Sequence, residues 1–157
     1  MNIVKELNIL FEEFKFQPRK LSNREEKKEE MDLKKLEEYK KILSNKTHIG
    51  DLLIISNTLE DLVNLKQVEG VLEIVDCHRL TTLSNLNYVS RDLLLLGCEN
   101  LKSLGNLRFV GGRLEILDCD AIDISQLKKI DCKNRVSINN KEFKNMEEFI
   151  KFGSTKL

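Results

Sequence analysis

Apolar positions in the middle of the chain recur at a constant interval. Leu65, Leu86 and Leu107 are evenly spaced, 21 positions apart, and each is preceded by asparagine and followed three positions later by valine. Inside each repeat, apolar residues also alternate with a period of two, starting at Leu52 and Ile54. A period of two indicates a β-strand, and an internal repeat of this length indicates a solenoid. The pattern therefore predicts one short strand per coil, with the strands stacked in parallel about 4.8 Å apart.

The other recurring apolar positions are predicted to point into the solenoid. No coil can bury them alone, because the coils above and below it supply the remaining walls of the core. The strand positions are Leu52 and Ile54, Leu72 and Ile74, Leu93 and Leu95, and Leu114 and Ile116. Four further inward columns are predicted: Leu59, Leu80, Leu101 and Ile122; Leu62, Leu83, Leu104 and Ile124; Leu65, Leu86, Leu107 and Leu127; and Val68, Val89, Val110 and Ile130.

A glycine precedes most of the predicted strands, at Gly50, Gly70 and Gly112. Glycine suits a corner where the backbone needs a positive φ or where two chain segments approach closely. Arg91 takes this place in the third coil. A positive φ is therefore not required at every corner.

Helical patterns precede the repeats. Residues 1–14 place apolar side chains at helical spacing, which predicts an amphipathic helix that ends before Pro18. A second helix is predicted from Asn23 to Leu43, after a possible capping box formed by Ser22 and Glu25. Its narrow apolar stripe, expected to lean on the solenoid, consists of Leu33, Leu36, Tyr39 and Leu43.

The repeat loosens after Ile130. Val136 and Ile138 indicate a last strand, and a capping helix is predicted to follow Asn139 and Asn140 and to stop near Gly153. Such a helix would cover the open end of the solenoid. Its apolar residues are Phe143, Met146, Phe149 and Ile150. The predicted organisation is a helical segment over 1–47, a solenoid over 48–139 and a capping helix over 140–157, within a single structural domain.

The segment from Asn64 to Leu83 reads NLKQVEGVLEIVDCHRLTTL. This string resembles the leucine-rich coils of receptor L domains and their microbial relatives, which read roughly NLxxIxGxLxIxxCxxLxxL, and it recurs from Gly50 to Ile130. The resemblance implies an α/β fold: a right-handed parallel leucine-rich-repeat solenoid of four to five coils, flanked by helices. It also implies a protein that binds partners on a flat or concave face and is not an enzyme.

The amino-acid composition argues against several classes of function. The 26 basic and 26 acidic residues cancel, so no global field attracts nucleic acid or an anionic membrane. No apolar stretch is long enough to cross a bilayer, and residues 1–14 do not resemble a secretory signal. Four cysteines in such a chain favour free thiols in a reducing compartment. We therefore expect a cytoplasmic protein without membrane association.

Two repeated polar columns have a structural interpretation. Cys77, Cys98 and Cys119 recur at the same interval as the leucines, and a straight column does not offer the converging ligands that zinc requires. They are expected to be core thiols, with Cys132 outside the column and unpaired. The amides of Asn64, Asn85, Asn106 and Gln126 are expected to satisfy backbone groups of the coils.

The outward strand positions are the first candidate binding surface. They form one apolar column and one mixed column, and together would expose a patch of a few hundred Å² if bare. Something is expected to cover this patch: the chain's own amphipathic segment 1–14, a second protein or a second copy. The residues are Ile55, Val75, Leu96 and Leu117 in the first column, and Leu53, Glu73, Leu94 and Glu115 in the second.

A second candidate surface carries Tyr88 and Phe109 one coil apart, close to Arg108. Basic residues interleaved with aromatic ones, here with Lys66, Lys128 and Lys129 nearby, can bind single-stranded nucleic acid. A protein-binding site built on Tyr, Phe and Arg is favoured over that alternative, because the net charge is zero and only two rings are present.

Little in the chain indicates catalysis. It has two histidines, no glycine-rich phosphate loop and no isolated acid pair, so no enzyme activity, cofactor, metal or small-molecule substrate is expected. The leading hypothesis is a protein–protein interaction module. The alternative is a structural component whose outward apolar column docks copies together or onto a larger assembly, such as a phage particle. A single-stranded nucleic-acid binder is the least favoured function.

Overall fold

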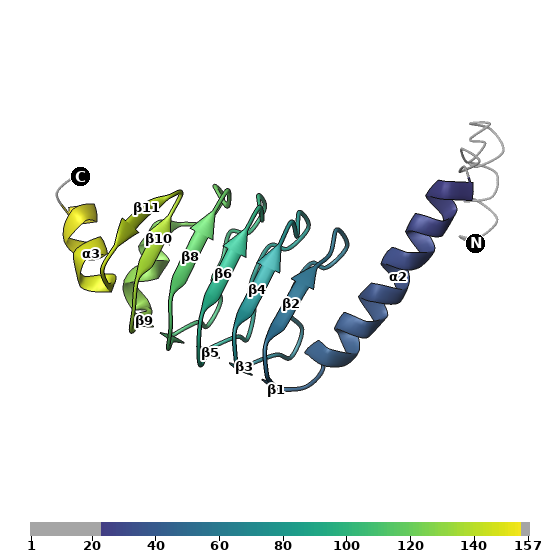
Figure 1. The fold of residues 1–157 in the computed structure, drawn as a ribbon, viewed down its shortest axis with the longest axis horizontal. Coiled ribbons are helices and arrows are strands. Elements are labelled where there is room, and N and C mark those ends of the chain that lie inside the picture. Colours follow the sequence, from purple (N-terminus) through teal and green to yellow (C-terminus); the bar gives the residue numbers. More distant parts are fainter. Residues whose placement is uncertain (1–22, 155–157) are drawn as a thin grey trace, which may run out of the picture. The chain divides into compact units, whose positions relative to one another are not determined.

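The computed structural model describes residues 23–154, and the amphipathic helix predicted over residues 1–14 lies outside this range (Figure 1). Two compact units are distinguished, Met1–Glu30 and Met31–Leu157. The described part of the first unit is the beginning of helix α2, and the second unit contains every described strand. The strands form a β-solenoid of about four turns within a mixed α/β fold.

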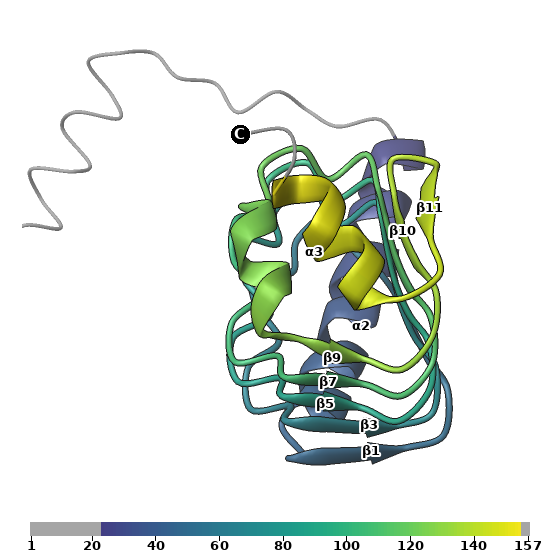
Figure 2. The same ribbon diagram turned by 90° about the vertical axis from the view of Figure 1, so that its left-hand side faces the viewer.

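Two sheets make up the walls of the solenoid (Figure 2). Neighbouring strands in each sheet are parallel, with the exception of the antiparallel pair β10–β11. The five-stranded sheet consists of β1 (Thr47–Ile49), β3 (Gln67–Glu69), β5 (Tyr88–Val89), β7 (Phe109–Val110) and β9 (Asp131–Cys132). The six-stranded sheet consists of β2 (Leu52–Ile55), β4 (Leu72–Val75), β6 (Leu93–Leu96), β8 (Leu114–Leu117), β10 (Val136–Ile138) and β11 (Lys141–Phe143).

Leucines of successive coils lie in register in the core, as the repeat predicts. Leu72 pairs with Leu93 and Leu93 with Leu114, and the side chains of all three are fully buried. The predicted inward columns are buried as well, apart from Ile124. Since burying one such side chain contributes about 1.5–3 kcal/mol, these columns are the main stabilising feature of the solenoid.

Glycine occupies the corners of the coils for two different physical reasons. Gly50 has a φ of +100°, which L-residues rarely adopt. Gly70 and Gly112 lack a positive φ, but a Cβ atom at either position would overlap the preceding coil: Gly50 carbonyl oxygen for Gly70 and Asp92 Oδ1 for Gly112. Close packing of adjacent coils therefore accounts for glycine at these two corners.

Helix α2 (Asn23–Leu43) has the predicted bounds, but only part of the predicted stripe is buried. Leu43 is fully buried, and Leu36, Tyr39 and Ile42 pack against the core. Leu33 remains 60% exposed, so its assignment to the buried stripe was wrong. The C-terminal part of the helix contacts the first coil, where the hydroxyl of Tyr39 accepts a hydrogen bond of 3.1 Å from the Ile55 amide.

The fourth coil departs from the repeat. The 3₁₀ helix η1 (Ile124–Lys129) replaces the turn of the other coils, and the carboxylate of its N-cap Asp123 accepts a hydrogen bond from the Ser125 amide. Ile124 lies at the start of this helix and is 50% exposed, so the prediction that it points inward was wrong. The shorter fourth repeat places its side chain outside the core.

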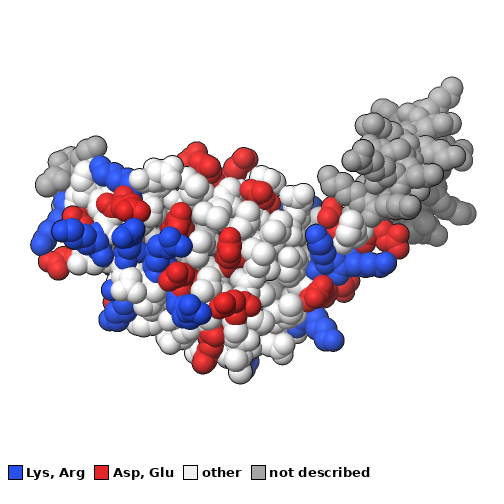
Figure 3. All heavy atoms as spheres, viewed as in Figure 1, with Lys and Arg blue, Asp and Glu red and all other residues white. Residues whose placement is uncertain are grey.

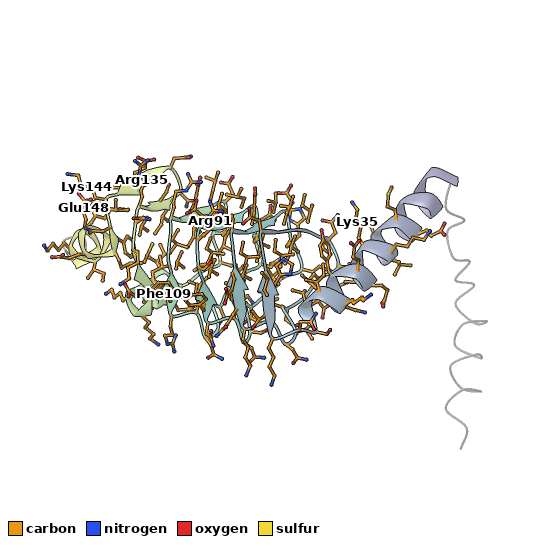
Figure 4. The ribbon with its side chains drawn as sticks, turned by 60° about the horizontal axis from the view of Figure 1, so that its bottom comes forward. Lys35, Arg91, Phe109, Arg135, Lys144 and Glu148 are labelled. Carbon is orange, nitrogen blue, oxygen red and sulfur yellow. The ribbon has the colours of Figure 1, made fainter. Side chains whose placement is uncertain are left out.

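The C-terminal end closes with β11 and helix α3 (Met146–Ser154). Phe143 lies in β11 and not in the helix as predicted, because β11 turns back against β10. Asn145 caps the helix instead of Asn139 or Asn140: its Oδ1 accepts a hydrogen bond of 2.9 Å from the Glu148 amide. Glu148 in turn accepts a hydrogen bond from the Lys144 amide, and both side chains lie at the start of α3 (Figure 4).

Candidate protein-interaction surfaces

The outward side chains of β2, β4, β6 and β8 form two columns on the six-stranded sheet. Leu53 pairs with Glu73, Glu73 with Leu94 and Leu94 with Glu115, and the residues two positions later in each strand pair in the same way. Leu53 and Ile55 on the first strand are 50% and 46% exposed, and the others are partly exposed. We call this surface the strand face; it consists of Leu53, Ile55, Glu73, Val75, Leu94, Leu96, Glu115 and Leu117.

The charged side chains at the border of the strand face mostly form ion pairs with one another. Arg113, which directly precedes β8, pairs with Glu115 of that strand at 3.3 Å, and Arg91 lies 3.8 Å from Asp51 across two coils. Within residues 23–154, the Glu73 carboxylate forms no ion pair and accepts no hydrogen bond. Figure 3 shows the face as a mainly uncharged area with a few acidic side chains, and basic side chains gather towards the β11 end.

The second candidate surface lies on the five-stranded sheet (Figure 4). The rings of Tyr88 and Phe109 stack with centroids 5.0 Å apart and planes 7° from parallel. Lys133 Nζ lies 5.7 Å from the centroid of Phe109 and also pairs with Asp131 at 2.7 Å. Arg108 is exposed next to the rings, but its guanidinium donates a hydrogen bond to the Leu107 carbonyl oxygen. We call Tyr88 and Phe109 the aromatic pair.

Stacking limits what the aromatic pair can bind. One face of each ring is covered by the other ring, and the cation of Lys133 lies over the Phe109 ring. A nucleobase that stacks on a protein needs a free ring face. The stacked pair therefore offers fewer ring faces for base stacking than two separate rings would.

The cysteine column is part of the core. Cys77, Cys98 and Cys119 are buried free thiols, and each donates a hydrogen bond from Sγ to a backbone carbonyl oxygen. The neighbouring Cys98 thiol, and then burial, raise the pKa of Cys119, and burial raises the pKa of Cys132. Raised pKa values keep the Cys119 and Cys132 thiols protonated and poorly nucleophilic near neutral pH, whereas the hydrogen bond with Cys98 lowers the pKa of Cys77.

The amide column satisfies backbone groups at two of its four positions. Asn85 Nδ2 donates a hydrogen bond to the Val63 carbonyl oxygen one coil earlier. Gln126 accepts one from the Leu104 amide and donates one to the Lys102 carbonyl oxygen. These bonds tie neighbouring coils together, in agreement with the structural interpretation of the two residues.

The described residues show no arrangement typical of a metal site. No group of three or more His, Cys, Asp and Glu side chains among them could hold a metal ion. His78 lines an open surface hollow beside Arg79, which forms an ion pair with Glu60. The Nε2 atom of His48 lies 3.4 Å from the Asp51 carbonyl oxygen. Across residues 23–154, none of the helices has the length and apolar character needed to span a membrane.

Three contributors to these surfaces were missed in the sequence. Val71 precedes β4 and is partly exposed beside Glu73, Arg113 neutralises Glu115, and Lys133 covers Phe109. The period of two, extended by one position before each strand, would have indicated Val71 and Arg113. Lys133 carried no such signal, because the repeat loosens after Ile130.

Comparisons with protein-family models, with curated proteins and with solved structures find no match for this chain.

Proposed function

We propose that this protein is a non-enzymatic, cytoplasmic protein-interaction module with a leucine-rich-repeat-like solenoid, and that its strand face binds a partner protein. The observation that carries the proposal is the register of the two outward columns. Hydrogen-bonded parallel strands hold Ile55, Val75, Leu96 and Leu117 in one line, and the buried leucines behind them fix the sheet.

A rigid apolar surface of this kind favours binding, because little conformational entropy is lost when a partner covers it. Burying a fully exposed apolar side chain contributes about 1.5–3 kcal/mol, and a side chain that is already partly buried contributes correspondingly less. Leu53 and Ile55 have the most exposed surface to lose. The first coil is therefore expected to contribute the largest share of the binding free energy.

The aromatic pair supports the proposal less strongly. Its rings are already stacked on each other, and the Lys133 cation is shared with Asp131. It is a secondary candidate for protein contact. Single-stranded nucleic acid is disfavoured at this surface by the covered ring faces and by the zero net charge.

Affinity capture with matched variants tests the proposal. Leu96→Asp places a charge in the strand face, and Ile124→Asp makes the same kind of change at a half-exposed residue of η1 outside that face. We expect the full-length wild-type chain and Ile124→Asp to retain the same partner protein, and Leu96→Asp to lose it. Thermal unfolding of each variant verifies that the solenoid remains folded.

Two outcomes would contradict the proposal. In the first, the captured protein binds Leu96→Asp as tightly as the wild type. In the second, the wild type captures only RNA or DNA in a salt-sensitive manner that Arg108→Ala abolishes, which would identify the alternative function.

A further inference from the structure

Glu73 is the one charged residue of the strand face that lacks a partner among the described residues. It is partly buried, and its cross-strand neighbours are Leu53 and Leu94. Val71, which directly precedes β4, and Val75 within β4 flank it two positions away on either side. Glu115, the other carboxylate of the face, differs because Arg113 already neutralises it at 3.3 Å.

We propose that the strand face binds a protein that places a lysine or arginine opposite Glu73, and that a second copy of this chain does not occupy the face. This inference rests on the proposed function. An apolar cover would remove water from the Glu73 carboxylate, and a buried carboxylate without a cation or hydrogen-bond donors is unfavourable. A basic side chain in the partner offsets this loss.

Within residues 23–154, the cations nearest to Glu73 are already paired with other carboxylates. Arg113 is paired with Glu115, and Arg91 lies beside Asp51, which also accepts a hydrogen bond from the Val71 amide. The position of Val71 corresponds to that of Arg113 two coils later, so the coil of Glu73 has valine where the coil of Glu115 has arginine. The neutralising charge must come from outside the face.

Symmetry argues against self-pairing. In a two-fold dimer the same patch is used on both subunits, so each residue of the face meets a residue of the same face. With the axis along the strands, Glu73 would meet a member of its own column, which contains Leu53, Leu94 and Glu115 but no cation. With the axis along the solenoid, it would meet Val71, Glu73 or Val75 of the other copy. In neither of these two arrangements does a cation of the face lie opposite Glu73.

The partner's chemistry follows from these neighbours. Aliphatic or aromatic side chains would cover Leu94, Leu96 and the exposed Leu53 and Ile55. One basic side chain would reach Glu73 between them. Arginine suits this position better than lysine, because its planar guanidinium can form two hydrogen bonds with one carboxylate.

Sedimentation of the full-length chain tests the exclusion of a second copy. We expect wild-type protein and Leu96→Asp to sediment as the same species over the whole concentration range. A wild-type dimer that Leu96→Asp dissociates would overturn the inference.

Selection from a displayed library of random linear peptides tests the partner's chemistry. Peptides that bind the strand face are identified as those that bind the wild type and Ile124→Asp but do not bind Leu96→Asp. We expect them to share a lysine or arginine flanked by apolar residues, and Glu73→Gln to weaken synthetic versions about 10-fold or more. Glu69→Gln, on the exposed five-stranded sheet, is the matched control and should leave the affinity unchanged. Exchanging the charges, with Glu73→Lys and an acidic residue in the peptide, should restore binding.

The outcomes separate the two proposals. Peptides that require Leu96 but contain no basic residue, or that bind Glu73→Gln equally well, would overturn the inference about Glu73 and leave the proposed function in place. A selection in which no peptide depends on Leu96 would overturn both.

Discussion

The rings of Tyr88 and Phe109 stack across adjacent coils, with centroids 5.0 Å apart. Their spacing follows from the fold, because β5 and β7 are hydrogen-bonded neighbours and these two residues are paired in register. The fold thus converts two aromatic residues that lie one repeat apart in the sequence into a direct contact. The contact connects the coils on the outside of the solenoid, opposite the buried leucines.

The stacked rings are expected to stabilise the solenoid cooperatively. A double-mutant cycle with Tyr88→Ala and Phe109→Ala should give a coupling free energy of unfolding of about 1 kcal/mol, because stacked aromatic pairs contribute about 0.5–1.5 kcal/mol beyond their buried area. Urea unfolding followed by circular dichroism measures it. Arg108→Ala, beside Phe109, is the control and should not couple to Tyr88→Ala. Additive effects of the two ring deletions would contradict the prediction.

Adjacent leucines of β6 should differ sharply in their contribution to stability. Leu93 is fully buried and Leu94 is partly exposed on the strand face. Leu93→Ala should lower the free energy of unfolding by about 2–5 kcal/mol, since it leaves a cavity in the core. Leu94→Ala should lower it by about 1 kcal/mol or less. Equal losses in denaturant unfolding of the two variants would contradict the alternation of inward and outward positions.

Most of the fold could be predicted from the period of the apolar residues. The constant interval of the repeat fixes which residues stack, so the sequence identifies Leu72, Leu93 and Leu114 as a column without any knowledge of loop geometry. The same regularity predicts both columns of the strand face. Their role in binding stays a prediction, because register and exposure describe a surface and not its occupant.

The errors lie where the repeat ends. Ile124 fits the period but lies in a 3₁₀ helix, and Phe143 fits a helical spacing but belongs to a strand that folds back. Leu33 has the spacing of a buried position on α2, but its side chain is exposed. In each case the apolar spacing is present in the sequence, but packing at the boundary of the repeat determines whether the side chain is buried and in which element it lies.

The corner at Gly70 should not tolerate a larger residue. A Cβ atom there would overlap the carbonyl of Gly50, so Gly70→Ala should destabilise the protein by about 1–3 kcal/mol. Gly153 provides the opposite case, since an added Cβ atom meets no atom within 4 Å and alanine favours the α3 helix. Gly153→Ala should stabilise the protein by up to about 1 kcal/mol. Thermal unfolding of the two variants would refute the packing argument if Gly70→Ala were as stable as the wild type.

The Cys98 thiol, in the middle of the column, should make stability fall at alkaline pH. The hydrogen bond with Cys119 lowers the pKa of Cys98, but the hydrogen bond with Cys77 and burial outweigh it and raise this pKa from 9.0 to about 11. An unfolded thiol therefore loses its proton first as the pH rises. The contribution of the protonated thiol to stability is complete below pH 9.0 and is lost progressively between 9.0 and about 11.

Urea unfolding at a series of pH values measures this loss, and Cys98→Ala is the comparison. The variant should be less stable at neutral pH, but its stability should fall less steeply above pH 9.0, because the titrating group is absent. Cys132→Ala, outside the column, controls at neutral pH for the general loss of stability on removing a buried thiol; because the pKa of Cys132 is also raised, it is not a control for the pH slope. Identical pH slopes for the wild type and Cys98→Ala would show that the Cys98 thiol ionises equally easily in the folded and unfolded chain, contrary to the raised pKa.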